Sequence, residues 1–222
     1  MSEFVLTKRF DTEVERTQRV LDVAEMFGLG LDDKTFTVLN DLKLEIRDGD
    51  IVYITGQSGS GKSTILKELR RGFEKLGKKI AVAGEIEMQE VPIVDQVYPE
   101  EKSLSKPLEL FSLVGLSDAN LFLRKPSELS DGQRYRFMLA KMIESGAEIW
   151  MADEFLALLD RMTAKVIAYN VQKIARKVGA TLVVATTHRD MFEDLAPSLF
   201  IEKGYQDKVK LVTEENLELL GS

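Results

Sequence analysis

Residues 51–64 read Ile51-Val52-Tyr53-Ile54-Thr55-Gly56-Gln57-Ser58-Gly59-Ser60-Gly61-Lys62-Ser63-Thr64, and this stretch decides the fold of the 222-residue chain. The run from Ile51 to Ile54 is apolar and largely β-branched, which predicts a short buried strand. The glycines let the backbone curl around an anion with successive N–H groups pointing inward. Apolar residues then recur at helical spacing up to Gly77, where a glycine stop is expected. A strand, a glycine-rich loop and a helix in this order predict a phosphate-binding loop.

The loop offers a group for each part of a bound ATP. We expect Lys62 to reach the β- and γ-phosphates, Ser63 to hold Mg²⁺ and Thr64 to donate to phosphate. The start of the following helix adds the positive end of its dipole. The predicted ATP-binding residues of the loop are Gly56, Ser58, Gly59, Ser60, Gly61, Lys62, Ser63 and Thr64. The alternative is a glycine-rich turn with an exposed lysine, which the flanking strand and helix make less favourable.

A second motif supplies a metal anchor and a group to activate water. It reads Ile149-Trp150-Met151-Ala152-Asp153-Glu154. The four apolar residues predict a buried strand whose end projects Asp153 toward Mg²⁺ and Glu154 toward the attacking water. The alternative is an acidic helix N-cap after a core strand.

Composition is typical of an ordinary globular protein and disfavours some classes of binding partner. Its net charge is -7 and its pI about 5.0, so a general attraction to nucleic acid or anionic lipid is not favoured. Without cysteine, neither a disulfide nor a thiolate metal site is possible. Because we find neither a signal-peptide profile nor an apolar run of about 18 residues, we expect a cytoplasmic protein.

Strands alternate with helices along the chain. The stretch 40–45 alternates as a strand, 166–178 predicts an amphipathic helix closed by Gly179, and 181–185 predicts another buried strand. This order predicts an α/β fold with a mostly parallel sheet flanked by helices and ligands at the carboxyl ends of the strands. The helix 134–143 is expected to follow Ser130 and Asp131.

The glycines and prolines between the periodic segments predict one domain, 1–222, with a core, a lobe and an extension. We assign the nucleotide-binding core to 20–92 and 146–213. Residues 93–145, in which prolines and Gly115 interrupt apolar-periodic pieces, predict a short helical lobe. Residues 1–19 form an N-terminal extension whose alternating run, 4–10, predicts an edge strand or a hairpin.

These motifs together resemble the ATP-binding-cassette (ABC) ATPases, and the resemblance covers about 21–200. The stretch Leu129-Ser130-Asp131-Gly132-Gln133 is similar to the family signature, normally Leu-Ser-Gly-Gly-Gln. The resemblance implies a P-loop NTPase fold of the ABC type, with an antiparallel N-terminal β part added to the sheet. It also implies Mg²⁺ as cofactor and ATP and ADP as ligands.

The resemblance assigns further residues to the site. Gln96 is similar to the lid glutamine that touches Mg²⁺ and water, His188 to the switch histidine at the γ-phosphate, and Asp160 to the end of a loop that couples two sites. Phe27 is the first candidate for stacking on adenine, with Phe36 second. Each has a structural alternative: Gln96 as an ordinary loop residue, and the aromatic residues as core.

A head-to-tail homodimer follows from the resemblance. Each ATP would lie between one copy's phosphate loop and the other copy's signature, formed by Ser130, Asp131, Gly132 and Gln133. Asp131 departs from the family because it stands where a glycine is usual. We expect its carboxylate to face solvent and cap the helix rather than face the phosphate.

Three functional readings remain open. The first is a stand-alone ATPase whose ATP-driven dimerisation serves an intracellular protein partner, since the stretch between Gln96 and Ser130 is shorter than in typical transporter cassettes. The stretches around Gln96, Ser130 and His188 also resemble a subgroup sometimes fused to acetyltransferase-like domains. The alternatives are the nucleotide-binding subunit of a membrane transporter and a DNA- or RNA-associated ATPase. A module that binds ATP without hydrolysing it is disfavoured by Glu154, Gln96 and His188.

Overall fold

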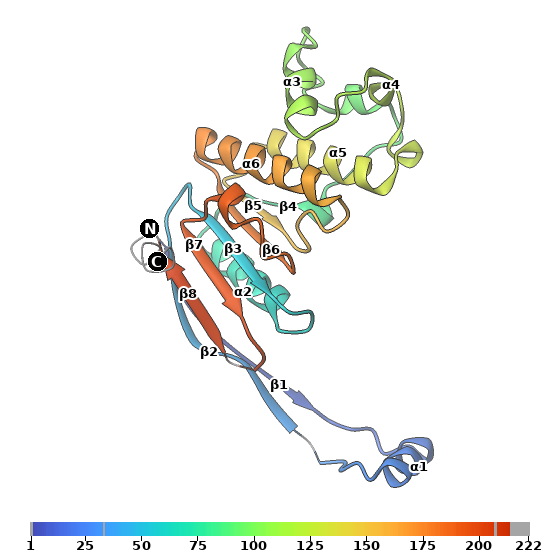
Figure 1. Ribbon diagram of the computed structural model, residues 1–222, viewed down its shortest axis with the longest axis vertical. Coiled ribbons are helices and arrows are strands. Elements are labelled where there is room, and N and C mark those ends of the chain that lie inside the picture. The colour runs from blue at the N-terminus through green and yellow to red at the C-terminus, as the bar shows by residue number, and fades with distance from the viewer. Residues whose placement is uncertain (1, 33, 207, 214–222) are drawn as a thin grey trace.

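A computed structural model describes residues 2–32, 34–206 and 208–213, and its centre is a six-stranded sheet (Figure 1). The strand order is β4-β5-β6-β3-β7-β8. The strands are β3 (Ile51–Gly56), β4 (Ile80–Val82), β5 (Ile149–Ala152), β6 (Thr181–Thr186), β7 (Leu199–Lys203) and β8 (Val209–Thr213). All neighbours pair in parallel except β8, which is antiparallel to β7. The mostly parallel sheet is therefore confirmed, whereas β4, β7 and β8 were not predicted.

Alternate residues of β3 feed two separate hydrophobic cores. Ile51 and Tyr53 lie in the core under α5 (Asp131–Glu144) and α6 (Arg161–Val178), while Val52 and Ile54 lie in the core under α2 (Lys62–Lys75). This follows from the period of two along a strand. Helices therefore cover both faces of the sheet, and the short helix α7 (Phe192–Leu195) adds to the first layer.

Two predicted helices begin earlier than the periodicity indicated. Helix α5 starts at Asp131 rather than at 134, because the Ser130 side chain caps it by accepting a hydrogen bond from Gln133 N (3.3 Å). Helix α6 starts at Arg161 rather than at 166, because Asp160 caps it by accepting from Thr163 N (3.0 Å). A polar cap, rather than the first apolar residue of the periodic pattern, sets each boundary.

A small helical lobe stands on α5, as predicted. It contains α3 (Ser105–Leu113), α4 (Ala119–Phe122) and the 3-10 turns η2 (Ile93–Gln96) and η3 (Pro126–Glu128); a further turn, η1 (Ala83–Glu85), follows β4. The ring of Phe111 stacks on Phe122 with centroids 5.1 Å apart and lies 6.3 Å from Phe137 of α5. The lobe and the sheet thus share the hydrophobic core that lies under α5 and α6.

The N-terminal part forms a long hairpin rather than a separate extension. Strand β1 (Ser2–Thr12) pairs antiparallel with β2 (Lys34–Ile46), which confirms the hairpin expected for 4–10. The root packs on α2, where Phe4 meets Phe73 with ring centroids 4.9 Å apart. The outer part, residues 9–37, is here called the arm. It leaves the body at the end opposite to α3 and α4 and carries α1 (Gln18–Phe27) at its tip (Figure 1). The boundary expected between residues 19 and 20 instead falls within α1.

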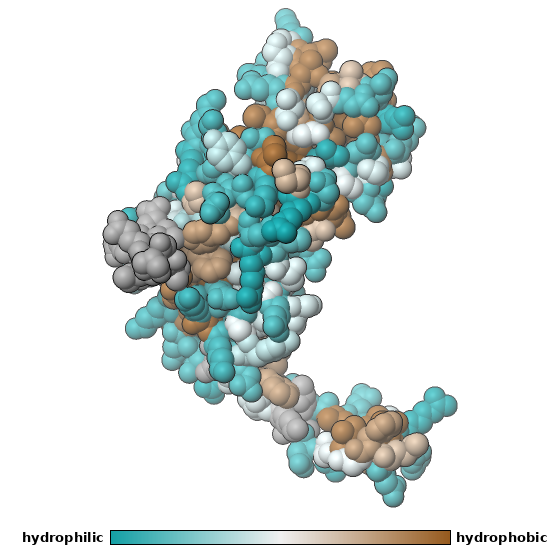
Figure 2. All heavy atoms as spheres, in the orientation of Figure 1, coloured by the Kyte–Doolittle hydropathy of each residue, from teal (hydrophilic) through white to brown (hydrophobic). Residues whose placement is uncertain are grey.

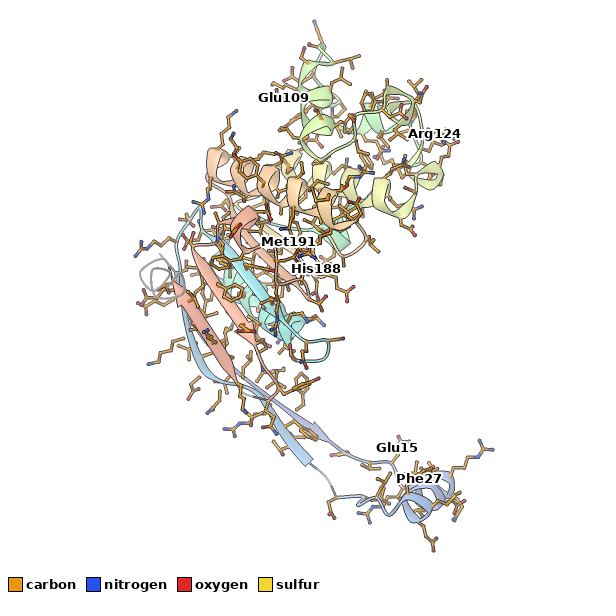
Figure 3. All side chains as sticks on the ribbon, in the orientation of Figure 1. Glu15, Phe27, Glu109, Arg124, His188 and Met191 are labelled. Carbon is orange, nitrogen blue, oxygen red and sulfur yellow. The ribbon has the colours of Figure 1, made fainter. Side chains whose placement is uncertain are left out.

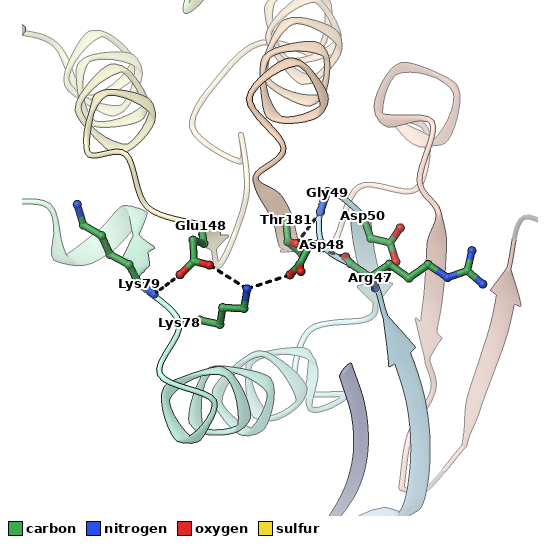
Figure 4. A network of polar contacts seen from close by, with 8 residues as sticks. All are labelled: Arg47, Asp48, Gly49, Asp50, Lys78, Lys79, Glu148 and Thr181. Atoms are coloured by element: carbon green, nitrogen blue, oxygen red, sulfur yellow. Dashed lines mark hydrogen bonds and ion pairs between the residues drawn. The ribbon is translucent and has the colours of Figure 1, made fainter. Parts of the chain in front are cut away.

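A polar network ties the amino ends of the strands together, at the edge away from the phosphate loop (Figure 4). Lys78 Nζ contacts Glu148 (2.8 Å) and Asp48 (3.2 Å), and Thr181 Oγ1 accepts from Gly49 N (3.0 Å). Contact with Lys78 lowers the pKa of Glu148, and contact with Glu148 and Asp48 raises that of Lys78. The network holds the sheet at one edge, so the opposite edge is left for the site.

Candidate nucleotide-binding site

Three neighbouring strands deliver the predicted groups to one edge of the sheet. Strand β6 lies between β5 and β3, so the segments that follow these strands meet at their carboxyl ends. The phosphate loop follows β3, Asp153 and Glu154 follow β5, and His188 follows β6. Figure 3 shows His188 at this edge, beside the ends of the strands. This edge is where open α/β sheets bind ligands.

Two glycines of the loop have no room for a side chain. Gly56 has φ 150°, and a Cβ there would lie 2.2 Å from the carbonyl oxygen of Lys203 on β7. Gly61 has φ 102°, and a Cβ there would lie 2.6 Å from Cγ1 of Val38 on β2. The loop is therefore packed between β7 and the root of the hairpin, and its curvature depends on glycine.

Lys62 begins α2 and lies in the middle of these groups. Its Nζ donates to the carbonyls of Gly56 and Gln57, both at 2.9 Å, and the side chain is buried. Burial lowers the pKa of Lys62, while the nearby charges of Asp153 and Glu154 act in the opposite direction. The ammonium group is therefore held within the loop and within electrostatic reach of both carboxylates.

The segment after β5 is fastened on both sides, which fixes the place of Glu154. Phe155 N donates to Ala185 O of β6 (2.8 Å), and Leu156 N donates to the hydroxyl of Tyr135 on α5 (3.0 Å). Burial raises the pKa of Tyr135 to about 12, so its hydroxyl keeps its proton at neutral pH. Glu154 itself is exposed and has φ 48°, an unusual backbone for a residue with a side chain. Tyr135 was not predicted, because its spacing indicates only a core position.

His188 is held through its backbone by two hydroxyls from β3. Both Tyr53 Oη and Thr55 Oγ1 donate to its carbonyl oxygen, the latter at 3.1 Å, and both side chains are fully buried. Burial raises the pKa of Tyr53 above its usual value, so the phenol remains a donor. The strand that carries the phosphate loop thus also positions the histidine. We refer to these two hydrogen bonds as the hydroxyl clamp.

The signature segment has the geometry of a capped helix N-terminus. Ser130 and Gln133 bond each other's backbone N–H groups, at 3.3 and 3.0 Å. The Asp131 side chain is 82% exposed and lies 3.8 Å from the guanidinium of Arg134. The expectation that Asp131 faces solvent at the helix end agrees with this placement. Gly132 lies against Leu159, so the signature also contacts the segment that ends at Asp160.

Gln96 is not aimed at the phosphate loop, contrary to the role expected for it. Its Nε2 donates to the carbonyls of Gln89 (2.7 Å) and Val91 (2.8 Å), and its Oε1 accepts from Gln89 N (2.8 Å). Both amide hydrogens are therefore used inside its own turn, and the side chain is buried. In this arrangement Gln96 shapes the lobe rather than binding an ion.

Phe27 is likewise not brought to the site. It lies on α1 at the arm tip, 71% exposed, far from His188 (Figure 3). Phe36, the second choice, lies on β2 two residues before Val38, which touches the loop. Phe10 of β1 pairs directly with Phe36, and both are about half exposed. The alternation in 4–10 does not show which residues of a second strand lie opposite, so this aromatic pair was not predicted.

The oxygens beside the loop suit Mg²⁺ held jointly with phosphate. Ser63 and Asp153 are both exposed, and hydroxyl and carboxylate oxygens are the ligands that Mg²⁺ prefers. Within residues 2–32, 34–206 and 208–213, no group of three His, Cys, Asp or Glu side chains could hold a metal alone. The residues therefore fit an ion that takes its remaining ligands from the nucleotide and water.

In the part of the chain that the structure describes, no helix has both the length and the apolar composition needed to cross a membrane.

Comparison with known proteins places the chain in a large family. The profile of the ABC transporter family matches residues 39–157, more than half of the chain. The methionine import ATP-binding protein MetN of Xylella fastidiosa is 26% identical, over 83% of this chain and 64% of its own length. The macrolide export ATP-binding/permease protein MacB of Vibrio parahaemolyticus is 31% identical, over 76% of this chain and 30% of its own length. The chain thus spans less than two thirds of these relatives.

A solved structure shows the same fold. The ATP-binding cassette MJ0796, in a dimeric post-hydrolysis state bound to ADP and Pi, superposes with a TM-score of 0.60. It is 21% identical and covers 80% of this chain and 91% of its own. The P-loop NTPase fold of the ABC type is thereby confirmed. Together, the match over 39–157 and the phosphate loop, acidic pair and capped signature show that this chain belongs to the ABC transporter family.

Proposed function

We propose that this chain binds Mg-ATP at the phosphate loop and hydrolyses it in a composite site completed by a second copy. The observation that carries the proposal is the position of Lys62, inside the loop and within electrostatic reach of Asp153 and Glu154. Lys62, a cation that can bind phosphate, and Glu154, a carboxylate that can activate water, therefore lie at the same edge of the sheet. The start of α5 presents the positive end of its helix dipole, which favours a phosphate, and we propose that it serves the partner copy.

The residues divide the work of phosphoryl transfer to water. Lys62 and the loop N–H groups bind the phosphates, and Ser63 and Asp153 would hold Mg²⁺, which supplies charge neutralisation when bound. Glu154 orients and deprotonates the attacking water, and His188 steadies the transferred group. Ser130, Gly132 and Gln133 of the other copy close the site, with Asp131 at the rim. Asp160, beside this seam, couples the two sites.

The relatives favour a transporter subunit over the stand-alone ATPase that the short lobe suggested. Both named relatives are ATP-binding proteins of import or export, so we propose that this chain is the nucleotide-binding subunit of a membrane transporter. A stand-alone ATPase is the second candidate, favoured by the small lobe and by the arm, which precedes the matched region. A cytoplasmic location and a lack of nucleic-acid partners stay predictions.

Two measurements test this function. The purified chain should hydrolyse ATP only with Mg²⁺, at a rate per molecule that rises with protein concentration because two copies form each site. A rate per molecule independent of concentration would refute the composite site. Isolation from the native cell in mild detergent should recover a multi-spanning membrane protein with this chain, and recovery of the chain without one would favour the stand-alone candidate.

Removing one half of the hydroxyl clamp should slow the reaction without weakening ATP binding. In Tyr53→Phe the ring keeps its packing on Phe200, 5.3 Å away, but one hydrogen bond to His188 is lost. A hydrogen bond is worth about 1 kcal/mol, so kcat should fall about fivefold with KM for ATP unchanged. Tyr169→Phe, which alters an exposed hydroxyl on α6, is the control. Equal loss in both variants would contradict the clamp.

Phe36 should contribute to nucleotide affinity, whereas Phe27 should not. Stacking on a base is worth about 1–3 kcal/mol, so Phe36→Ala should weaken ADP binding by about fivefold or more. Calorimetry with ADP measures this without requiring dimer formation. Phe27→Ala is the matched control, because its ring lies at the arm tip. The assignment fails if the two variants bind ADP equally well.

A further inference from the structure

The arm ends in an apolar surface that the body of the protein does not cover. Five large apolar side chains on or next to α1 are 38–79% exposed: Leu21, Val23, Met26, Phe27 and Leu29. Figure 2 shows a hydrophobic cluster at the tip of the arm. A groove of about 460 Å³ runs beside them between Val14 and Leu31. Helices this short are marginal in water by themselves, and of the residues in α1 only Ala24 is buried. Such a surface is typical of a binding site.

The tip of the arm, residues 13–32, has an excess of acidic side chains, which restricts what can cover it. Glu13, Glu15, Asp22, Glu25 and Asp32 outnumber the two basic residues of the tip, Arg16 and Arg19. Two identical tips would therefore repel each other if they met face to face. A covering surface should combine apolar contact with positive charge.

The helical lobe carries such a surface at its outer end. Leu123 follows α4 and is 73% exposed, and the next two residues, Arg124 and Lys125, are exposed as well. Figure 3 shows Arg124 on the outside of the lobe, at the opposite end of the molecule from the tip. Within one copy the two surfaces are therefore too far apart to meet.

A second copy would bring them together. The arm is rooted beside the phosphate loop, where Val38 touches Gly61. In the proposed head-to-tail pair the partner's α5 faces this loop, and the lobe stands on α5. The partner's lobe then lies on the side toward which the arm extends.

We propose that the arm tip of each copy docks on Leu123, Arg124 and Lys125 of the other copy's lobe, forming a reciprocal clasp around the ATP-bound dimer. Twofold symmetry makes two equal clasps, so any change in one contact counts twice. The inference rests on the proposed function, because it takes its geometry from the head-to-tail pair. It gives the arm a role in stabilising the closed state.

The test compares dimer affinity in the Glu154→Gln background with ATP and Mg²⁺, by sedimentation. Met26→Ser with Phe27→Ser should raise the dimer dissociation constant by about tenfold or more, since both side chains lose apolar contact. Arg124→Glu with Lys125→Glu should raise it similarly. Adding Asp22→Lys and Glu25→Lys to that lobe variant should restore affinity. The control is Val178→Ser, which changes an exposed apolar residue on α6 rather than on the tip or the lobe.

The outcomes distinguish failure of the clasp from failure of the proposed function. If Glu154→Gln forms no ATP-dependent dimer, the proposed function fails. If it dimerises with unchanged affinity in the tip or lobe variants, only the clasp is overturned. Binding to zwitterionic lipid vesicles that is lost in the tip variant, with dimer affinity unchanged, would assign the tip to a membrane surface instead.

Discussion

Replacing Glu154 by glutamine is expected to lower ATP turnover by about 10²- to 10⁴-fold, the usual contribution of a general base. The amide keeps the shape of the side chain but has no basic oxygen to accept a proton from water. Because the loss affects chemistry and not binding, the variant should accumulate as an ATP-bound dimer. Turnover assays and sizing chromatography with ATP and Mg²⁺ measure the two effects.

The fold should survive this substitution, because Glu154 is exposed and its neighbours are fastened through their backbones. Thermal unfolding should therefore match that of the wild type. Glu193→Gln, an exposed change on α7, is the control for loss of a carboxylate elsewhere. A Glu154→Gln protein that turns over ATP near the wild-type rate, or that stays monomeric with ATP, would contradict the assigned role.

Replacing Lys62 by methionine is expected to weaken ATP binding by about 10- to 100-fold and to abolish detectable turnover. Hydrogen bonds to charged groups contribute roughly 1.5–3 kcal/mol, and Lys62 is the charged donor inside the loop. Methionine retains the apolar stem in its buried position but cannot bond the carbonyls of Gly56 and Gln57. The loop therefore loses part of its own support as well as its contact with phosphate.

Titration with a fluorescent ATP analogue measures the affinity, and calorimetric unfolding separates binding from stability. Lys67→Met removes an exposed lysine from the same helix and should bind ATP like the wild type. Equal affinity in the two variants would show that Lys62 does not touch phosphate. Loss of cooperative unfolding in Lys62→Met would instead show that its bonds to the loop carbonyls are essential for folding.

Predictions from local patterns agree with the structure where a feature depends on neighbours in the sequence. The phosphate loop lies between a strand and a helix because Ile51 to Thr64 encode both, together with the glycines that the curve requires. Asp153 ends a buried strand, and Gly179 closes α6 with φ 74°. In each case the cause is a spacing or a cap within a few residues.

Predictions that depended on distant pairing were less successful. Phe27 was the first candidate for stacking on adenine, but the hairpin carries it to the tip of the arm, whereas Phe36 lies on β2 two residues before Val38, which contacts the loop. Gln96 has the right type and position, yet its amide is satisfied by the backbone at Gln89 and Val91. Neither pairing is visible in a linear pattern, because hydrogen-bond partners are chosen in three dimensions.

The sequence by itself determined the loop, the acidic pair, the capped signature and thus the family, because those motifs are short and their interactions are local. Only the tertiary structure decided which side chains support them. The clamp of Tyr53 and Thr55 on His188, and the contact of Tyr135 with Leu156, join residues far apart in the chain. The arm exists for the same reason. Strands β1 and β2 pair along their length, and their outer ends continue past the body, so the segment between them lies away from both cores.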